Sequence, residues 1–437
     1  MNKNAFDKII GYTAIKKELE QIADILKNGD VYKALGVSAP KGLLLHGVPG
    51  VGKSLMASCL IEASGRNCYT CRKNKPNGDF VNHIKETFNK AAENAPSIVF
   101  LDDMDKFANG DERHKDAEEY VTVQSCIDEA KGKDVFVLAT ANNLRTLPSS
   151  LKRAGRFDRI IEVGTPVGED AVRIIEHYLK GKKTTAEMDA KSIARILNGN
   201  SCAELETVIN EAGLYAGFAR SEKITMEHFM EACMHTVFEV PPYQLEDDND
   251  YSADLHNKNS EISQVIYHEA GHAVVSEVLC PESVTVVSVY SRHGRGGGFT
   301  SYYHDPKNRP SQWNKSRILA ALGGLASVER KFGIMETGNT GDLRNAFFRV
   351  RATVTDDCVC GFSLYGRGFE DSNDLLLRQE QATAAEMEKY YRQTKEILAQ
   401  NADFFEKIAA ELAKKKLLTT ADIQRIKAEC TITPISF

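Results

Sequence analysis

Apolar residues follow one pattern in the first third of this chain and another after it. Short apolar runs, rich in Leu, Ile and Val, are separated by longer stretches of mixed polarity. These runs lie at 41–46, 97–101 and 134–138. Runs of about five such residues are typical of buried strands. The first part of the chain is therefore predicted to be an α/β domain, which we place at 1–165.

Beyond residue 165, apolar residues recur every three or four positions, which indicates amphipathic helices. These stretches lie at 169–180, 189–197, 203–219 and 226–236. Gly164 and Pro166 separate them from the first domain, since both residues commonly end regular structure. A small helical domain is predicted at 166–238.

A third region follows a polar, acidic stretch. Residues 241–250 begin with two prolines and have almost no apolar period, so we expect a linker at 239–260. Further helices and one β-branched strand are predicted after it. The helices begin near 260 and lie at 379–398 and 401–416, and the strand lies at 283–290. We therefore expect a mainly α-helical domain at 261–437.

Composition argues against a nucleic-acid-binding protein and a membrane-spanning protein, and it indicates a cellular compartment. The 437 residues carry a formal net charge of -6, which gives no sign of a nucleic-acid-binding surface. Apolar runs stay well below the roughly eighteen residues needed to cross a bilayer, so no membrane span is expected. The ten cysteines are scattered, as is typical of reduced thiols, and we expect a cytoplasmic location.

The first apolar run leads into a glycine-rich loop that matches the phosphate-binding loop in full. Its residues are Gly47, Val48, Pro49, Gly50, Val51, Gly52, Lys53 and Ser54. The glycines let backbone N–H groups surround phosphates, while the lysine reaches the β- and γ-phosphates and the serine hydroxyl binds magnesium. This loop predicts a site for ATP and Mg²⁺.

Polar residues follow the next two apolar runs. Asp102 and Asp103 end the second run, where the first would hold magnesium through water and the second would polarise the attacking water. Asn142 follows the third run and could orient that water. We expect these three side chains to take part in ATP hydrolysis.

The helix predicted from residue 260 carries His268, Glu269 and His272. Histidines four positions apart point to the same side of a helix, so both can bind one zinc ion, and the glutamate between them can act as general base. Zinc needs a third protein ligand. Asp342 follows a glycine-rich turn and could supply it, although an aspartate there more often caps a helix.

Residues 41–54, 98–105 and 137–159 resemble the AAA+ ATPases. This resemblance implies that Arg153 and Arg156 are finger residues that reach the γ-phosphate of a neighbouring subunit. It also implies that His177 lies beside the nucleotide ribose and that Ile10 and Gly11 wrap the adenine.

From residue 6 to about 418 the chain resembles the FtsH family of ATP-dependent zinc metalloproteases. That resemblance implies His268, His272 and Asp342 as zinc ligands, Glu269 as base, polypeptide substrates and a homo-hexameric ring with arginine fingers acting in trans. The implied architecture is an α/β AAA+ P-loop domain with a small helical lid, followed by a mainly α-helical zinc metallopeptidase domain.

The chain departs from the family pattern in three places. It begins at the ATPase domain without the usual membrane anchor, so we expect a soluble form or a fragment. Asp103 replaces the usual glutamate and is one methylene shorter, which can slow hydrolysis. The substrate-gripping loop, expected at 71–79, has no aromatic residue at the matching place.

These departures leave two alternatives to an ATP-driven protease. One is a zinc peptidase whose ATPase half is a nucleotide-controlled scaffold with weak or no unfolding activity. The other is a nucleotide-sensing adaptor that keeps a metal site for stability.

Overall fold

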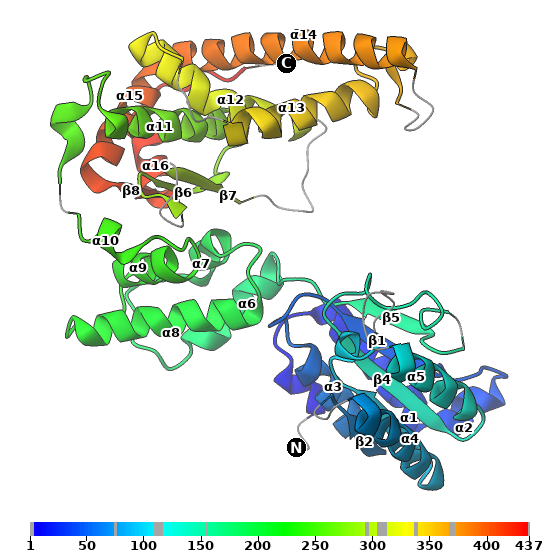
Figure 1. Ribbon diagram of the computed structural model, residues 1–437. Coiled ribbons are helices and arrows are strands. Elements are labelled where there is room, and N and C mark those ends of the chain that lie inside the picture. The colour runs from blue at the N-terminus through cyan, green and yellow to red at the C-terminus, as the bar shows by residue number, and fades with distance from the viewer. Residues whose placement is uncertain are drawn as a thin grey trace. The chain divides into compact units, whose positions relative to one another are not determined.

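The structure is a computed structural model that describes residues 4–73, 77–108, 117–153, 155–247, 249–292, 297–303, 313–335, 340–366 and 372–435. The chain divides into two compact units, Met1–Phe229 and Met230–Phe437 (Figure 1). Within the described parts of the chain, none of the helices combines the length and apolar content needed to cross a membrane.

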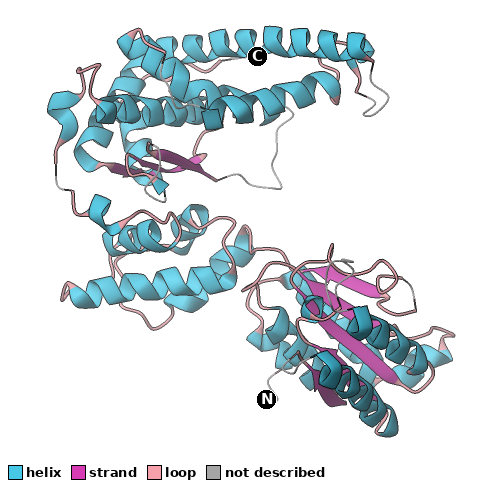
Figure 2. Ribbon diagram, in the orientation of Figure 1, coloured by secondary structure: helices cyan, strands magenta, loops and turns pink. Residues whose placement is uncertain are grey.

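The first unit is built on a five-stranded parallel sheet with the strand order β2-β3-β4-β1-β5. The strands are β1 (Gly42–His46), β2 (Asn67–Cys71), β3 (Ser97–Leu101), β4 (Val135–Ala141) and β5 (Arg159–Glu162). Helices cover the sheet (Figure 2). They are η1 (Ala5–Lys8), α1 (Thr13–Lys27), α2 (Gly29–Ala34), α3 (Lys53–Ser64), α4 (Asn77–Glu93), η2 (Met104–Lys106) and α5 (Ala117–Glu129).

The strand order places the predicted nucleotide residues at one edge of the sheet. β1 pairs with β4, which pairs in turn with β3, so the carboxyl ends of these three parallel strands lie side by side. Every residue of β3 and β4 is buried, which explains their largely apolar sequence. Ligands of open parallel sheets bind at this carboxyl edge.

A helical group follows the sheet. It contains α6 (Glu169–Leu179), α7 (Ala190–Ile196), α8 (Cys202–Phe218) and α9 (Met226–Thr236), and the last of these crosses the limit between the two units. Ser201 begins α8 with a capping box, in which its hydroxyl accepts from Glu204 N and Ser201 N donates to the Glu204 carboxylate. All four helices occur where the apolar period predicts them.

Residues 239–260, predicted to be a linker, contain the short helices α10 (Pro242–Leu245) and η3 (Tyr251–Asp254). Gln244 forms two hydrogen bonds with Ser291, donating from Nε2 to Oγ and accepting at Oε1 from the backbone N–H, at 2.8 and 2.9 Å. The proposed domain limits remain predictions.

The second unit is mainly helical and carries one small antiparallel sheet, so the predicted fold class is confirmed. Its helices are α11 (Glu261–Leu279), α12 (Trp313–Phe332), α13 (Thr340–Thr355), η5 (Phe362–Leu364), α14 (Asn373–Gln400), α15 (Ala402–Lys415) and α16 (Thr420–Ala428). The strands β6 (Val284–Ser288), β7 (Phe299–Tyr302) and β8 (Leu417–Thr419) pair in the order β7-β6-β8.

Helices α11 and α12 cross in backbone contact because glycines face each other. A Cβ atom on Gly271 would lie 2.4 Å from the carbonyl oxygen of Gly323, and one on Gly323 would lie 2.7 Å from the carbonyl oxygen of Gly271. Ser327 donates a hydrogen bond to the carbonyl of Tyr267 at 2.7 Å, which joins the two backbones. The helix that carries the predicted metal ligands is therefore tightly held along one side.

Candidate metal centre and nucleotide site

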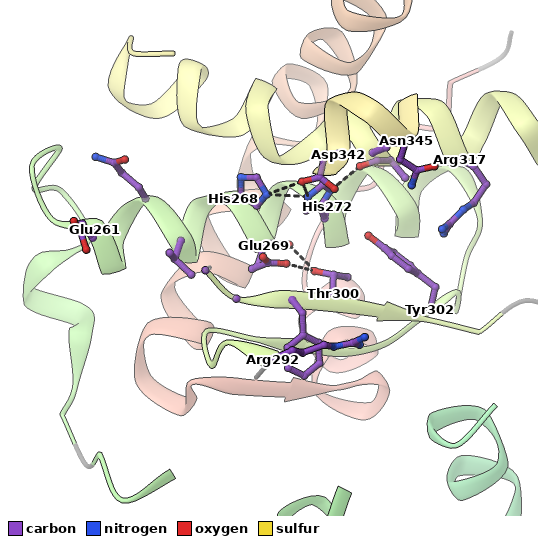
Figure 3. Close-up of a pocket in the computed structure, with 17 residues that line it drawn as sticks. Glu261, His268, Glu269, His272, Arg292, Thr300, Tyr302, Arg317, Asp342 and Asn345 are labelled. Atoms are coloured by element: carbon purple, nitrogen blue, oxygen red, sulfur yellow. Dashed lines mark hydrogen bonds and ion pairs between the residues drawn. The ribbon is translucent and has the colours of Figure 1, made fainter. Parts of the chain in front are cut away.

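Three predicted metal ligands converge in the second unit (Figure 3). His268 and His272 lie one turn apart on α11, and Asp342 lies in the first turn of α13. The Nε2 atoms of the two histidines are 3.0 Å apart. Oδ2 of Asp342 lies 3.3 Å from Nε2 of His268 and 3.4 Å from Nε2 of His272. The three side chains thus form a nearly regular triangle of donor atoms.

This triangle fits a tetrahedral zinc ion. Zinc bonds of about 2.0 to 2.2 Å to nitrogen and oxygen place the ligand atoms of a tetrahedron about 3.3 to 3.6 Å apart. The observed separations of 3.0 to 3.4 Å are close to that range. Two imidazoles and one carboxylate are also a ligand set that zinc commonly takes in enzymes, with a fourth position left open.

Neighbouring groups fix the orientation of these ligands. Nδ1 of His272 lies 2.7 Å from the carbonyl oxygen of Ala320, so it carries the proton and leaves the Nε2 lone pair for a metal. Burial tends to raise the pKa of Asp342, but hydrogen bonds with His268 and His272 outweigh it and hold the pKa well below its usual range. Gly324 makes room for His268, since a Cβ atom there would lie 2.4 Å from the ring.

Glu269 lies on the same helix but does not join the triangle. Its side chain is buried, and Oε2 accepts a hydrogen bond from the hydroxyl of Thr300 on β7 at 2.7 Å. Burial raises the pKa of Glu269, although the two histidines and the bond from Thr300 oppose that rise. A carboxyl group with a raised pKa beside a metal site is suited to accept a proton from water.

The side chains of His268, Glu269, His272 and Asp342 line a cavity of about 640 Å³. Its wall is also formed by Phe299, Thr300 and Tyr302 of β7 and by the preceding Gly298. β7 lies at the edge of its sheet, and in the described residues it pairs only with β6. An edge strand beside the candidate metal site can bind an extended chain through main-chain hydrogen bonds.

The phosphate-binding loop lies between β1 and α3 in the first unit. Gly47, Gly50 and Gly52 all have positive φ angles, of 150°, 80° and 94°. A Cβ atom on Gly47 would lie 2.0 Å from the carbonyl oxygen of Val163, so only glycine fits there. Nζ of Lys53 donates to the carbonyls of Gly47 and Val48 and to Oδ1 of Asn142, at 2.8 to 2.9 Å.

The acids after β3 lie within electrostatic range of the same lysine. Oδ1 of Asp102 accepts a hydrogen bond from the hydroxyl of Thr140 at 2.9 Å. The same oxygen lies 3.5 Å from the hydroxyl oxygen of Ser54, so both residues can share one magnesium site. Burial lowers the pKa of Lys53, and the charges of Asp103, Asp105 and Asp102 oppose that shift. The structure thus brings Lys53, Ser54, Asp102 and Asn142 together at the carboxyl edge of the sheet.

Asp103 has a left-handed backbone conformation and forms an ion pair with Lys106. Its φ angle of 54° lies in the left-handed region, which non-glycine residues adopt chiefly in turns and at functional sites. Oδ2 lies 2.7 Å from Nζ of Lys106 and 3.7 Å from Nη2 of Arg72. Two cations therefore compete for the carboxylate that is predicted to act on water.

Replacing Lys106 by alanine is expected to raise the rate of ATP hydrolysis about two- to fivefold. The lysine side chain is 57% exposed and that of Asp103 only 19%, so the pair belongs in the upper half of the range for surface pairs, about 0.5 to 1 kcal/mol, which corresponds to these rates. Steady-state phosphate release by the two proteins measures the difference. Lys90→Ala, which removes an exposed lysine from α4, is the control, and an unchanged or lower rate in K106A would show that the pair does not restrain Asp103.

The two predicted finger arginines differ in their surroundings. Arg153 is exposed. The guanidinium of Arg156 donates to both carboxylate oxygens of Asp128, at 3.1 and 2.6 Å, and to the carbonyl of Ser150 at 2.6 Å. Hydrogen bonds from Arg156 and Lys131 lower the pKa of Asp128 to about 2, so this contact is a charged pair.

The residues predicted to hold the base and ribose partly share one cavity. This cavity of about 230 Å³ includes Ile10 and His177, together with Gly50, Val51 and Gly52 of the phosphate-binding loop. Gly11 has a φ angle of 67°, and a Cβ atom on it would lie 3.0 Å from the carbonyl oxygen of Asp170. The loop expected at 71–79 includes residues 74–76, which lie outside the described residues.

Several residues at these two sites carry no sequence motif. Thr300 and Tyr302 are recognisable only from the alternation of β7, and Lys106 only from its position three residues after Asp103 in η2. Thr140 ends up beside Asp102 because β4 continues to Ala141, past the predicted end of the strand. Sequence position alone could have pointed to Thr300, Tyr302 and Lys106, but not to the residues that they contact.

Comparison with known proteins places both sites in families. Residues 43–165 match the AAA family, described as ATPase family associated with various cellular activities, and residues 256–426 match Peptidase family M41. The chain is 32% identical, over 96% of its length, to ATP-dependent zinc metalloprotease FtsH 2 of Symbiobacterium thermophilum, of which it covers 74%. It is 30% identical, over 98% of its length, to ATP-dependent zinc metalloprotease FtsH of Caldicellulosiruptor bescii, of which it covers 72%. Its identity to the chloroplastic FTSH 5 of Arabidopsis thaliana is 29% over 94% of the chain and 62% of that relative.

Proposed function

Because this chain belongs to the FtsH family of ATP-dependent zinc metalloproteases, we propose that it couples ATP hydrolysis in its first unit to cleavage of polypeptides in its second. The observation that carries this proposal is the triangle of His268, His272 and Asp342 with Glu269 beside it. A P-loop ATPase domain in the same chain supplies the energy source. The required cofactors are Zn²⁺, ATP and Mg²⁺.

The second unit binds substrate and moves protons. An extended polypeptide adds to β7, which pairs only with β6 among the described strands and lies along the cavity that Glu269 lines. When bound by the two histidines and Asp342, zinc supplies Lewis-acid activation of water and of the scissile carbonyl. The Glu269 carboxylate, oriented by Thr300, takes a proton from the attacking water and delivers it to the departing amide nitrogen.

The first unit binds ATP and Mg²⁺ and hydrolyses the nucleotide. The loop from Gly47 to Ser54 holds the phosphates, and Asp102 with Ser54 holds magnesium. Asp103 polarises the attacking water and Asn142 orients it. Ile10, Gly11 and His177 contact the adenine and ribose.

Ring assembly follows from the family relationship, and we propose that the ring is a homo-hexamer. Arg153 is exposed and reaches the γ-phosphate of the adjacent subunit, so that hydrolysis depends on assembly. Arg156 contributes as a finger after it leaves Asp128. A reducing compartment, the cytoplasm, suits the ten cysteines, all of which lie in described residues and are free thiols.

The proposal is tested by degradation of a labelled unfolded protein in four mixtures, with and without ATP and with and without a zinc chelator. Cleavage is expected only with ATP and without chelator, and added zinc restores it after chelation. Cleavage that continues when ATP is removed would instead support the scaffold peptidase, which the family relationship does not favour. Cleavage that resists the chelator would contradict the zinc mechanism.

A further inference from the structure

β7 directs two side chains toward the metal ligands. Residues two apart on a strand point to the same face about 6.6 Å apart, so Thr300 and Tyr302 share one side of β7. Thr300 already touches Glu269 on that side. In Figure 3 the phenol ring of Tyr302 rises from β7 in the same direction, with its hydroxyl toward the cluster formed by His272 and Asp342.

Tyr302 belongs to the same cavity as these ligands. It lines that cavity together with His268, His272 and Asp342. The negative charges of Glu269 and Asp342 both act on its hydroxyl, so the phenol lies within electrostatic range of the base and of a metal ligand. Tyr302 comes two residues after Thr300 on β7, so its side chain enters the cavity at a different point from the contact between Thr300 and Glu269.

The surroundings keep the Tyr302 hydroxyl protonated, and a hydrogen bond also joins this side chain to Ser276 on α11. Burial raises the pKa of Tyr302 far above its usual value, with the charge of Arg317 opposing that shift. Cζ of Arg317 on α12 lies 4.7 Å from the centre of the phenol ring. A cation over an aromatic face stabilises the ring position and adds positive potential to this side of the cavity.

We propose that Tyr302 is a catalytic residue whose O–H donates a hydrogen bond to the scissile carbonyl oxygen as negative charge develops on it. This inference rests on the function proposed above. Glu269 removes the proton from water while the C–O bond forms, and the same proton later goes to nitrogen as the C–N bond breaks. Tyr302 keeps its proton throughout. The site then has a base on one side of the reacting carbon and a neutral donor on the other, as charge stabilisation in the transition state requires.

The test compares wild type with Tyr302→Phe, which removes only the hydroxyl. The expected result is a fall in kcat of about 10- to 100-fold with KM changed less than about twofold, because the bond strengthens only in the transition state. Binding of a peptide phosphonamidate, a tetrahedral anion, is expected to weaken by a similar factor. Zinc content and the affinity for a peptide hydroxamate of the same sequence stay unchanged.

Tyr303→Phe is the matched control, because Tyr303 directly follows Tyr302 in the chain but is not among the residues that line this cavity. Tyr302→Gln, which restores a neutral donor, is expected to recover part of the phosphonamidate affinity. Unchanged phosphonamidate affinity in Y302F, or an equal loss for both inhibitors, would overturn the role of Tyr302. Failure of the proposed function itself is distinct, since wild type would then show neither zinc-dependent cleavage nor phosphonamidate binding.

Discussion

Replacing Glu269 by glutamine is expected to lower peptide-bond cleavage about a thousandfold while ATP hydrolysis and zinc content remain those of the wild type. Glutamine preserves the shape of the side chain and can still accept the hydrogen bond from Thr300. It cannot take a proton from water. The amide is also neutral, so the buried position between the histidines remains tolerable. The measurements are release of labelled peptide, phosphate release and bound zinc on the same preparation.

Glu261→Gln is the control for E269Q. Glu261 lines the same cavity at the start of α11 but is exposed, so its neutralisation changes the charge of the cleft without removing the base. Cleavage by E261Q is expected to remain within about twofold of wild type. Equal activity of E269Q and wild type would remove Glu269 from the mechanism and favour the adaptor alternative.

Replacing Arg153 by alanine is expected to reduce ATP hydrolysis about a thousandfold, because an arginine at the γ-phosphate stabilises charge in the transition state by that order. Nucleotide binding is expected to change little, since Arg153 is not among the residues that line the adjoining nucleotide cavity of its own chain. Degradation of a folded substrate should fail together with hydrolysis. Phosphate release and binding of a fluorescent ATP analogue measure the two effects separately.

A mixture of two inactive proteins tests whether this arginine acts in trans. R153A keeps an intact phosphate-binding loop, and Lys53→Ala keeps the finger, so mixed rings contain some complete sites between subunits. Partial recovery of ATP hydrolysis on mixing is expected, and Arg145→Ala, which removes another exposed arginine of the same unit, is expected to behave as wild type. A mixture with no recovered activity, in rings shown to exchange subunits, would place the finger in cis.

The fold was largely predictable because its apolar periods are strong. The runs at β1, β3 and β4 are short and mainly apolar because almost all of their residues are buried. Glycine-rich and histidine motifs depend on local spacing, so the phosphate-binding loop and the pair His268 and His272 could be located from the sequence. Weaker elements such as β5 and β2, each with a single buried residue, had no such signal.

Contacts between distant segments could not be predicted in the same way. Asp342 needed a family resemblance because 70 positions separate it from His272, and a capping role fitted the sequence better than a ligand role. The pairing of Arg156 with Asp128 depends on how α5 packs beside the loop after β4. The contact of Thr300 with Glu269 depends on β7 lying against α11, which strand alternation alone does not determine.

The glycine contact between α11 and α12 has an entropic consequence for metal loading. Since Gly271 and Gly323 bring the two backbones together, the pair of histidines is carried by a helix with little freedom to roll or slide. Their two nitrogen atoms form a preorganised clamp, and only Asp342 comes from a different helix. The conformational entropy lost when all three ligands bind the metal is therefore mainly that of α13, which carries Asp342. We expect the two histidines to bind the metal first and the Asp342 carboxylate to bind it afterwards.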